Sequence, residues 1–136
     1  NLLFSGGSGL PYTSRNMQGD IKGMLNSSRL AWQFRMDARI DKDMILNFGK
    51  GDNKRKGNLN IYFQILNVLN TKNIMFVYPT TGNPDDDGVL SAPEYQAMIT
   101  TQVSEAAYRT LYALHADNPS HYALPRRVRF GIELSF

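Results

Sequence analysis

Hydrophobic and polar residues alternate with a period of two in the last part of the chain. From residue 127 to residue 136, one set of alternate positions is apolar and the other is polar, charged or glycine. The apolar set is Val128, Phe130, Ile132, Leu134 and Phe136, and the other set is Arg127, Arg129, Gly131, Glu133 and Ser135. Because successive side chains of a β-strand point to opposite sides, this pattern predicts a final strand over about 124–136.

Three earlier segments are also predicted to be strands, at residues 1–13, 31–48 and 58–70. The first is interrupted by glycines and ends near Pro11, and residues 72–78 are a candidate extension of the third. The second alternates apolar Trp32, Phe34, Met36, Ala38 and Ile40 with polar Gln33, Arg35, Asp37, Arg39 and Asp41. The third has Leu59, Ile61, Phe63, Ile65 and Leu69 in its apolar register.

The connecting segments differ in length and composition. Residues 49–57 are rich in glycine and charge, which predicts a turn, and residues 14–29 form a polar loop. From 79 to about 122 the alternation is absent, and the second half of this insert has apolar residues at helical spacing. Ser91 and Thr100 are candidate helix caps there.

Strands with one apolar side and one charged side separate two different environments. In a soluble sheet the apolar side meets a core, whereas in an outer-membrane barrel it meets lipid and the polar side faces the lumen. The last residue, Phe136, falls in the apolar register, which favours the barrel. About four strands are too few to close a membrane barrel, which needs about eight or more, so we expect this chain to be the last part of a longer protein.

The lengths of the connections agree with a barrel. Outer-membrane barrels have short periplasmic turns and long external loops. With the chain end on the periplasmic side, residues 14–30 and 79–122 are predicted to be external and residues 49–57 to be a periplasmic turn. The predicted fold class is therefore all-β: the last antiparallel strands of a large transmembrane barrel, with a partly helical external loop.

Composition is compatible with this prediction. The 136 residues are 42% hydrophobic, and the mean hydropathy of −0.37 suits a barrel because half of each strand faces water. No apolar run approaches the roughly 18–20 residues of a membrane helix, and no basic-then-apolar leader starts the chain, so we expect a signal peptide to be absent or removed. The absence of cysteine excludes disulfides and thiolate metal sites. A net charge of +3 does not indicate a nucleic-acid partner.

One segment of the insert fits the twelve-residue calcium-loop template. Residues 83–94 have a glycine, Gly88, at the sixth position, where the template turns sharply. The predicted oxygen ligands are Asn83, Asp85, Asp87, the Val89 carbonyl, Ser91 and a bidentate Glu94. The first position is Asn rather than Asp, and no helix is predicted before the loop. A structural Ca²⁺ and a metal-free acidic surface turn remain alternatives.

Catalysis has little support in the sequence, and we expect no enzyme activity. His115 and His121 are the histidines of the chain, both in the insert, and no nucleophile triad, HExxH, P-loop or dinucleotide motif is present. The insert is also rich in tyrosine, which either contacts a ligand or packs the insert; packing is the favoured interpretation for Tyr95, Tyr108, Tyr112 and Tyr122. The predicted lumen residues Arg35, Asp37, Arg39, Arg127, Arg129 and Glu133 form no recognisable ligand code.

Several short segments resemble the C-terminal end of TonB-dependent outer-membrane receptors, in particular the large receptors with a carboxypeptidase-regulatory-like domain. They follow one another in the same order along the chain and together span most of it. The segments that carry the resemblance are Gly7–Thr13, Asn26–Trp32 leading into Arg35–Lys42, Phe63–Asn70, and Leu124–Arg127 before the final strand. The resemblance implies a barrel of about 22 strands with an N-terminal plug, in the outer membrane of a Gram-negative bacterium.

The resemblance also implies partners and roles. The partners are the rest of the barrel and the plug, outer-membrane lipid, the barrel-assembly machinery, TonB and a surface lipoprotein. Phe130, Ile132, Leu134 and Phe136 match the pattern of an assembly signal, and they are also predicted to face lipid. The implied function is uptake of a large ligand; the alternatives are a receptor-like barrel that scaffolds a surface complex and, less favoured, a soluble β-sandwich with a helical insert.

Overall fold

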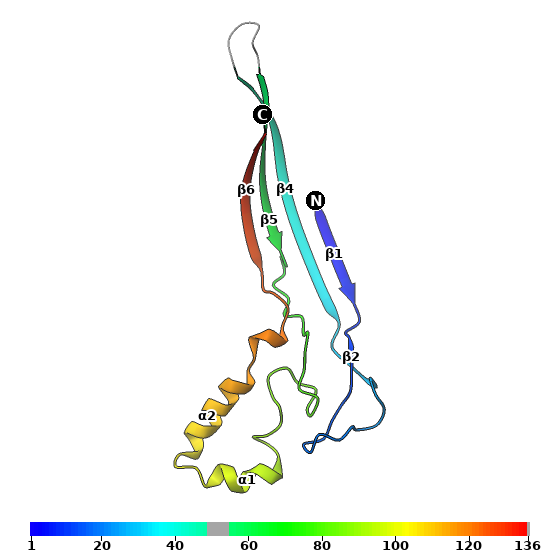
Figure 1. Cartoon of the computed structure of the whole chain (residues 1–136), viewed down its shortest axis with the longest axis vertical. Coiled ribbons are helices and arrows are strands. Elements are labelled where there is room, and N and C mark those ends of the chain that lie inside the picture. The colour runs from blue at the N-terminus through cyan, green and yellow to red at the C-terminus, as the bar shows by residue number, and fades with distance from the viewer. Residues whose placement is uncertain (49–54, 136) are drawn as a thin grey trace. The chain divides into compact units, whose positions relative to one another are not determined.

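The computed structural model describes residues 1–48 and 55–135 (Figure 1). In chain order the elements are β1 (Leu2–Gly7), β2 (Pro11–Tyr12), β3 (Ser28–Arg29), β4 (Gln33–Phe48), β5 (Arg55–Leu66), α1 (Pro93–Thr100), α2 (Glu105–Ala116), the 3-10 helix η1 (Pro119–His121) and β6 (Arg127–Ser135). Antiparallel strands predominate over helices, which confirms the β-rich part of the predicted fold class.

The contacts divide the chain into two compact units, which are described separately. The sheet unit comprises the described parts of residues 1–5, 34–71 and 124–136, and the loop unit comprises residues 6–33 and 72–123. The turn expected over 49–57 lies mostly outside the described residues, and residues 55–57 belong to β5.

The sheet unit is built on four strands in the order β1-β4-β5-β6 (Figure 1). β4 pairs with β5 from Ala38 opposite Ile65 onward, and β5 pairs with β6 from Leu66 opposite Arg127 onward, both antiparallel. At the β1 edge, the backbones of Asn1 and Arg39 exchange two hydrogen bonds of 2.8 and 2.9 Å, the pattern of an antiparallel pair. Consecutive antiparallel strands therefore lie side by side from β4 through β6.

β5 ends at Leu66, earlier than the strand expected over 58–70. Asn67 and Asn70 have φ of 56° and 52°, and the left-handed conformation that asparagine tolerates cannot continue a strand. The Asn67 side chain donates through Nδ2 to the Thr71 carbonyl and accepts through Oδ1 from the Thr71 N–H. Its Nδ2 also donates to the Leu124 carbonyl at 3.3 Å. The Asn70 side chain accepts from the Arg126 backbone at 2.9 Å. These bonds replace the strand ladder, so the expected extension over 72–78 is wrong, and β6 begins at Arg127.

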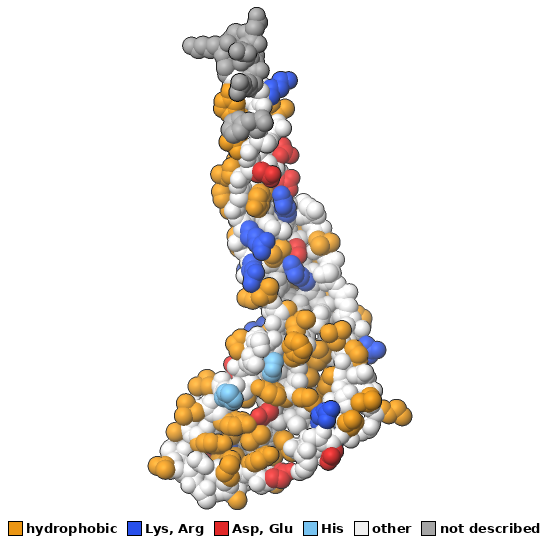
Figure 2. Space-filling model, in the orientation of Figure 1, with side chains coloured by type: hydrophobic (Ala, Val, Ile, Leu, Met, Phe, Trp, Pro, Cys, Tyr) orange, Lys and Arg blue, Asp and Glu red, His pale blue; other side chains and the backbone are white. Residues whose placement is uncertain are grey.

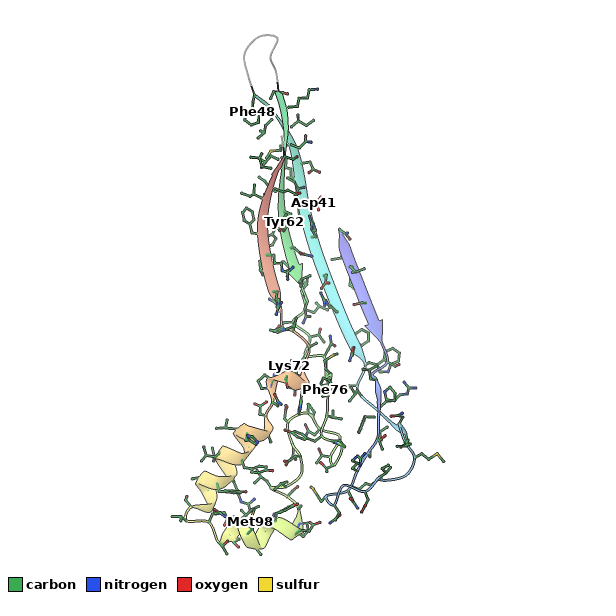
Figure 3. The ribbon with its side chains drawn as sticks, viewed as in Figure 1. Asp41, Phe48, Tyr62, Lys72, Phe76 and Met98 are labelled. Carbon is green, nitrogen blue, oxygen red and sulfur yellow. The ribbon has the colours of Figure 1, made fainter. Side chains whose placement is uncertain are left out.

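A glycine and a tyrosine interlock in the middle of the sheet. Gly131 of β6 lies directly opposite Tyr62 of β5. A Cβ added to Gly131 would lie 2.3 Å from Cζ of Tyr62, so the ring covers the glycine backbone. The guanidinium of Arg39 lies over the same ring, 4.6 Å from its centroid, in a cation–π contact. One aromatic ring thus joins three strands, because Arg39 belongs to β4. Figure 3 labels Tyr62 and its opposite residue Asp41.

The loop unit contains the short β2–β3 pair and the two helices. The side chain of Ser104 caps α2 by accepting from the Ala107 backbone at 3.3 Å, whereas α1 begins with Pro93 and has no side-chain cap. The helical insert expected from the sequence therefore consists of two helices, and the expected caps Ser91 and Thr100 are wrong, because Thr100 is the last residue of α1.

Arg109 of α2 fastens the two helices together. Its guanidinium donates to the Leu90 carbonyl at 3.0 Å, to Gln96 of α1 at 2.9 Å and to Glu105 at 2.8 Å. Apart from these hydrogen bonds, the loop unit has only a small apolar core. The buried hydrophobic residues of the described chain are Leu30, Ala92, Ile99 and Ala116, and all of them belong to the loop unit.

Replacement of Gly131 by alanine is expected to lower the free energy of unfolding by about 1–3 kcal/mol, because the new methyl group displaces the Tyr62 ring from Arg39 and from the β6 backbone. Urea denaturation, in the buffer or detergent that keeps the protein folded, measures this loss. Gly7→Ala is the control, since nothing lies within 4 Å of the added Cβ there. Equal losses in the two variants would contradict the interlock.

Candidate functional site

Apolar side chains of three strands gather on one side of the sheet. Directly opposite residues of antiparallel strands share a face, so the registers define rows across β4, β5 and β6. One row is Ile40, Phe63 and Phe130, and the rows beside it contain Ala38, Ile65 and Val128 on one side and Ile61 and Ile132 on the other. A fourth row contains Met44, Leu59 and Leu134. We call these rows the apolar face.

The apolar face is open rather than packed. Ile40 is 73% exposed, Phe130 66% and Ile132 61%, and even Phe63 on the inner strand β5 is 42% exposed. In the described part of the chain, no hydrophobic residue of the sheet unit is buried. Contiguous apolar surface of this kind marks contact with a membrane or another protein.

One charged side chain interrupts the apolar face. Lys42 lies opposite Ile61, in the row that ends with Ile132, and it is exposed. Its even position in β4 belongs to the apolar register, whose run of apolar residues from Trp32 stops at Ile40. A lysine can keep its stem on apolar surface while its ammonium group reaches water or a polar headgroup.

The opposite side of the sheet carries charges and amides, as Figure 2 illustrates by the acidic and basic side chains over the strands. We call it the polar face. Its charges on β4 are paired along the strand: Arg35 Nε lies 2.8 Å from Asp37 Oδ1, and Arg39 Nε lies 3.2 Å from Asp41 Oδ1. Asp43 accepts a hydrogen bond of 2.7 Å from Asn60 of β5. The spacing of two residues in the sequence carries the signal for these pairs.

The predicted lumen residues are brought together on this polar face. Arg39, Gln64 and Arg129 form one row across the three strands, and in the neighbouring row Arg127 lies opposite Leu66 of β5. Asp37 also accepts from the Asn67 backbone at 2.8 Å, which ties the strand to the turn after β5. The sequence prediction missed the Tyr62–Gly131 interlock at the centre of this face, although a glycine inside a strand was its signal.

Three of the residues proposed as an assembly signal lie on the apolar face of β6. Phe130, Ile132 and Leu134 are all exposed there and lie opposite Phe63, Ile61 and Leu59, respectively. Phe136 lies outside the described residues, so the structure gives no position for the last member of the set. The role of the set in assembly stays a prediction.

The acidic segment 83–94 of the loop unit folds around tyrosines. The Tyr122 hydroxyl donates to Asp85 Oδ2 at 2.6 Å, and the Tyr112 hydroxyl donates to Asp87 Oδ2 at 2.7 Å. A shallow cavity of about 260 Å³ lies beside them. It is lined by Asp85, Asp86, Asp87, Leu90, Ser91, Tyr112, Ala113 and Ala116. Both tyrosines therefore pack the insert.

The other predicted calcium ligands point to different partners. Asn83 accepts from the Asp85 backbone at 2.9 Å, Ser91 donates to the Gly88 carbonyl at 3.1 Å, and Glu94 accepts from Gln18 at 3.3 Å. Val89 contributes its backbone N–H to Asp87 at 3.0 Å. In the described residues, no group of three or more His, Asp or Glu side chains gathers as a metal site. Calcium binding by this segment stays a prediction.

The two histidines belong to the packing of the insert. His121 Nδ1 lies 2.6 Å from the Pro84 carbonyl, and its ring meets Tyr78 edge-on with 4.9 Å between the centroids. The ring of His115 lies 6.4 Å from that of Tyr112. The hydrogen bond to Pro84 and the adjacent bond from Tyr122 to Asp85 fasten η1 to the start of the acidic segment.

The hydrogen bonds to the carboxylates alter the acidity of the tyrosines. The bond to Asp85, together with partial burial and the negative charge of that carboxylate, raises the pKa of Tyr122 from 10 to about 12. Burial, followed by the bond to Asp87, raises the pKa of Tyr112 further. Both phenols are therefore neutral donors at physiological pH.

In the part of the chain that the structure describes, no helix has the length and apolar character needed to cross a membrane. Comparisons with family models, with curated proteins and with solved structures find no match to this chain.

We expect Asp85→Asn to lower the pKa of Tyr122 toward 10, because the variant loses the carboxylate charge that favours the neutral phenol. Since the folded-state pKa exceeds the unfolded value of about 10, the stabilisation by this bond is complete below pH 10 and is lost as pH rises through 12. Ultraviolet titration of phenolate absorbance measures the shift. Asp86→Asn is the control, because Asp86 bonds the Gly88 backbone and no tyrosine; identical titrations of the two variants would refute the assignment.

The same titration tests calcium binding. If the segment binds Ca²⁺ as the sequence predicts, the positive charge of the ion offsets that of the Asp85 carboxylate and lowers the pKa of Tyr122, as Asp85→Asn does. The Asp85→Asn protein should then show no further shift on addition of calcium. A titration of the native protein that calcium leaves unchanged would rule out the ion at residues 83–94.

Proposed function

We propose that this chain forms part of the wall of a transmembrane β-barrel in the outer membrane of a Gram-negative bacterium, with the apolar face toward lipid and the polar face toward the lumen. The observation that carries the proposal is the open apolar face, which extends over β4, β5 and β6 opposite a charged face. A strand in a barrel wall has this two-sided pattern.

The lengths of β4, β5 and β6 support the proposal. A transmembrane β-strand has about 9–11 residues when it is tilted in the membrane. β5 has 12 residues and β6 has 9, and β4 is longer with 16. A soluble sandwich is less consistent with these strands, because it would bury their apolar side chains under a second layer.

Lys42 limits how such a wall sits in the bilayer. A lysine on the lipid side costs about 2–4 kcal/mol at the midplane but only about 0–1 kcal/mol near an interface. The proposal therefore assigns the row of Lys42, Ile61 and Ile132 to the neighbourhood of a membrane interface, where the ammonium group reaches headgroups or water.

The resemblance of the sequence to TonB-dependent receptors supports a more specific function. In this proposal the barrel takes up a ligand too large for passive pores, in cooperation with a plug and with TonB outside this chain. The paired arginines and aspartates of the polar face suit a watery lumen, because each arginine on β4 has a carboxylate two residues away.

Two neighbouring substitutions on β5 test the orientation of the wall. Phe63→Lys is expected to reduce stable insertion in the outer membrane, because it introduces a charge among Ile40 and Phe130, one row from Lys42. The expected cost lies between the about 0–1 kcal/mol of an interface and the about 2–4 kcal/mol of the midplane. Gln64→Glu is the control, since it introduces a charge on the polar face of the same strand, between Arg39 and Arg129. Membrane fractionation and heat-modifiable gel mobility measure folded barrel.

The two variants distinguish lipid from water. Because Phe63 is already 42% exposed, a sheet whose apolar face meets water would accept a charge at position 63 about as well as at position 64. Equal amounts of folded protein in the two variants, or recovery of the native protein in the soluble fraction, would overturn the proposal.

A further inference from the structure

The charged side chains of β6 have no charged partner among the described residues. On the polar face Arg127, Arg129 and Glu133 lie opposite Leu66, Gln64 and Asn60 of β5, respectively, none of which carries a charge. Arg127, Arg129 and Glu133 are exposed, and the ion pairs of the described chain involve other residues. We call these three residues the β6 charges.

Asn60 cannot neutralise the acidic member of this set. Its Nδ2 already donates to Asp43 of β4, while its Oδ1 is buried and has no hydrogen-bond partner. Asn60 is an uncharged amide, so the residue of β5 that lies opposite Glu133 supplies no charge of opposite sign. The inner strand β4, by contrast, has Arg35 and Arg39 paired within the strand.

The missing partners coincide with an open strand edge. β6 is the last strand of the sheet order, so one of its edges pairs with β5 and the other has no strand beside it in the described chain. Such an edge presents unpaired backbone groups that favour the addition of another strand. Opposite charges on directly opposite residues stabilise a strand pair, and like charges destabilise it.

We propose that the open edge of β6 pairs, antiparallel, with a strand from outside this chain that carries Asp or Glu opposite both Arg127 and Arg129 and Lys or Arg opposite Glu133. Counted from its N-terminal end, the partner strand has a basic residue at the first position, opposite Glu133. It has acidic residues at the fifth and seventh positions, opposite Arg129 and Arg127, and apolar residues at the second, fourth and sixth. The inference rests on the proposed function in one respect: the sheet continues past β6.

A second copy of β6 satisfies these charges less completely. With two β6 strands antiparallel and Phe130 opposite Phe130, Arg127 of each copy would lie opposite Glu133 of the other. Arg129 would then lie opposite Gly131, which offers no charge. A strand of different sequence can pair all three β6 charges, so the charge pattern favours it.

Photo-crosslinking in the protein as it exists in its native cells identifies the neighbour. A benzophenone amino acid at Phe130 reaches the residue opposite it on the same face, and mass spectrometry of the digested product identifies the attached peptide. The expected peptide lies outside residues 1–136 and has the alternation stated above. Ile40 is the control position, because β4 has strands on both sides and should crosslink within this chain.

Each other outcome overturns the inference. A peptide without the two acidic residues, a peptide from β6 of a second copy, or only crosslinks within this chain in a membrane-embedded protein would contradict the partner strand while leaving the barrel proposal intact. Recovery of the native protein in the soluble fraction would instead overturn the proposed function, which membrane fractionation of the same cells records separately.

Charge exchange then tests the pairing itself. Arg129→Glu is expected to shift the unfolding equilibrium toward the unfolded form about two- to fivefold, because it faces an acidic residue on the partner strand. Substitution of that acidic residue by arginine should restore the native equilibrium. Lys56→Glu on the polar face of β5 is the control and should not be rescued by the same substitution. Failure of the rescue would contradict the proposed pairing.

Discussion

The structure depends on the antiparallel register that aligns β4, β5 and β6. Because side chains alternate along each strand, this register collects the large apolar residues of three strands on one side and their charges on the other. A shift of β4 or β6 by one residue would bring charged side chains among the apolar ones, and a shift of β5 would bring Asn60, Tyr62 and Gln64 there. The Tyr62 ring helps to fix the register. It covers Gly131 and contacts Arg39 only when Gly131 lies directly opposite Tyr62 and Arg39 lies in the next row.

The asparagines after β5 have a complementary role, because they end the ladder at a defined row. Asn67 bonds the turn that follows β5 and also binds Asp37 of β4 through its backbone, so the end of one strand is tied to the middle of another. In the loop unit a different kind of interaction predominates. There the apolar core is small. Hydrogen bonds from tyrosines to carboxylates, and from Arg109 to both helices, connect its segments.

The period of two made most of the sheet predictable. The alternation of Val128, Phe130, Ile132 and Leu134 indicated both the strand and its apolar face, and Arg35 with Asp37 and Arg39 with Asp41 were readable as same-face pairs. The end of β5 was not, because Asn67 and Asn70 stop the strand through side-chain bonds to residues distant in the sequence. The contacts of Asp85 and Asp87 were also unpredictable, because their tyrosine partners lie 37 and 25 residues away.

The central claim is that lipid covers the apolar face while water reaches the polar face. Because this chain has no cysteine, single cysteines introduced from position 59 to position 65 can carry spin labels at unique sites once any cysteine elsewhere in the protein is replaced. The accessibility of each label to oxygen, which concentrates in lipid, and to a water-soluble nickel complex is then measured in the protein reconstituted in bilayers. The account predicts that odd positions are accessible to oxygen and even positions to nickel, with a period of two. Equal accessibility to nickel along the whole of β5 would contradict it.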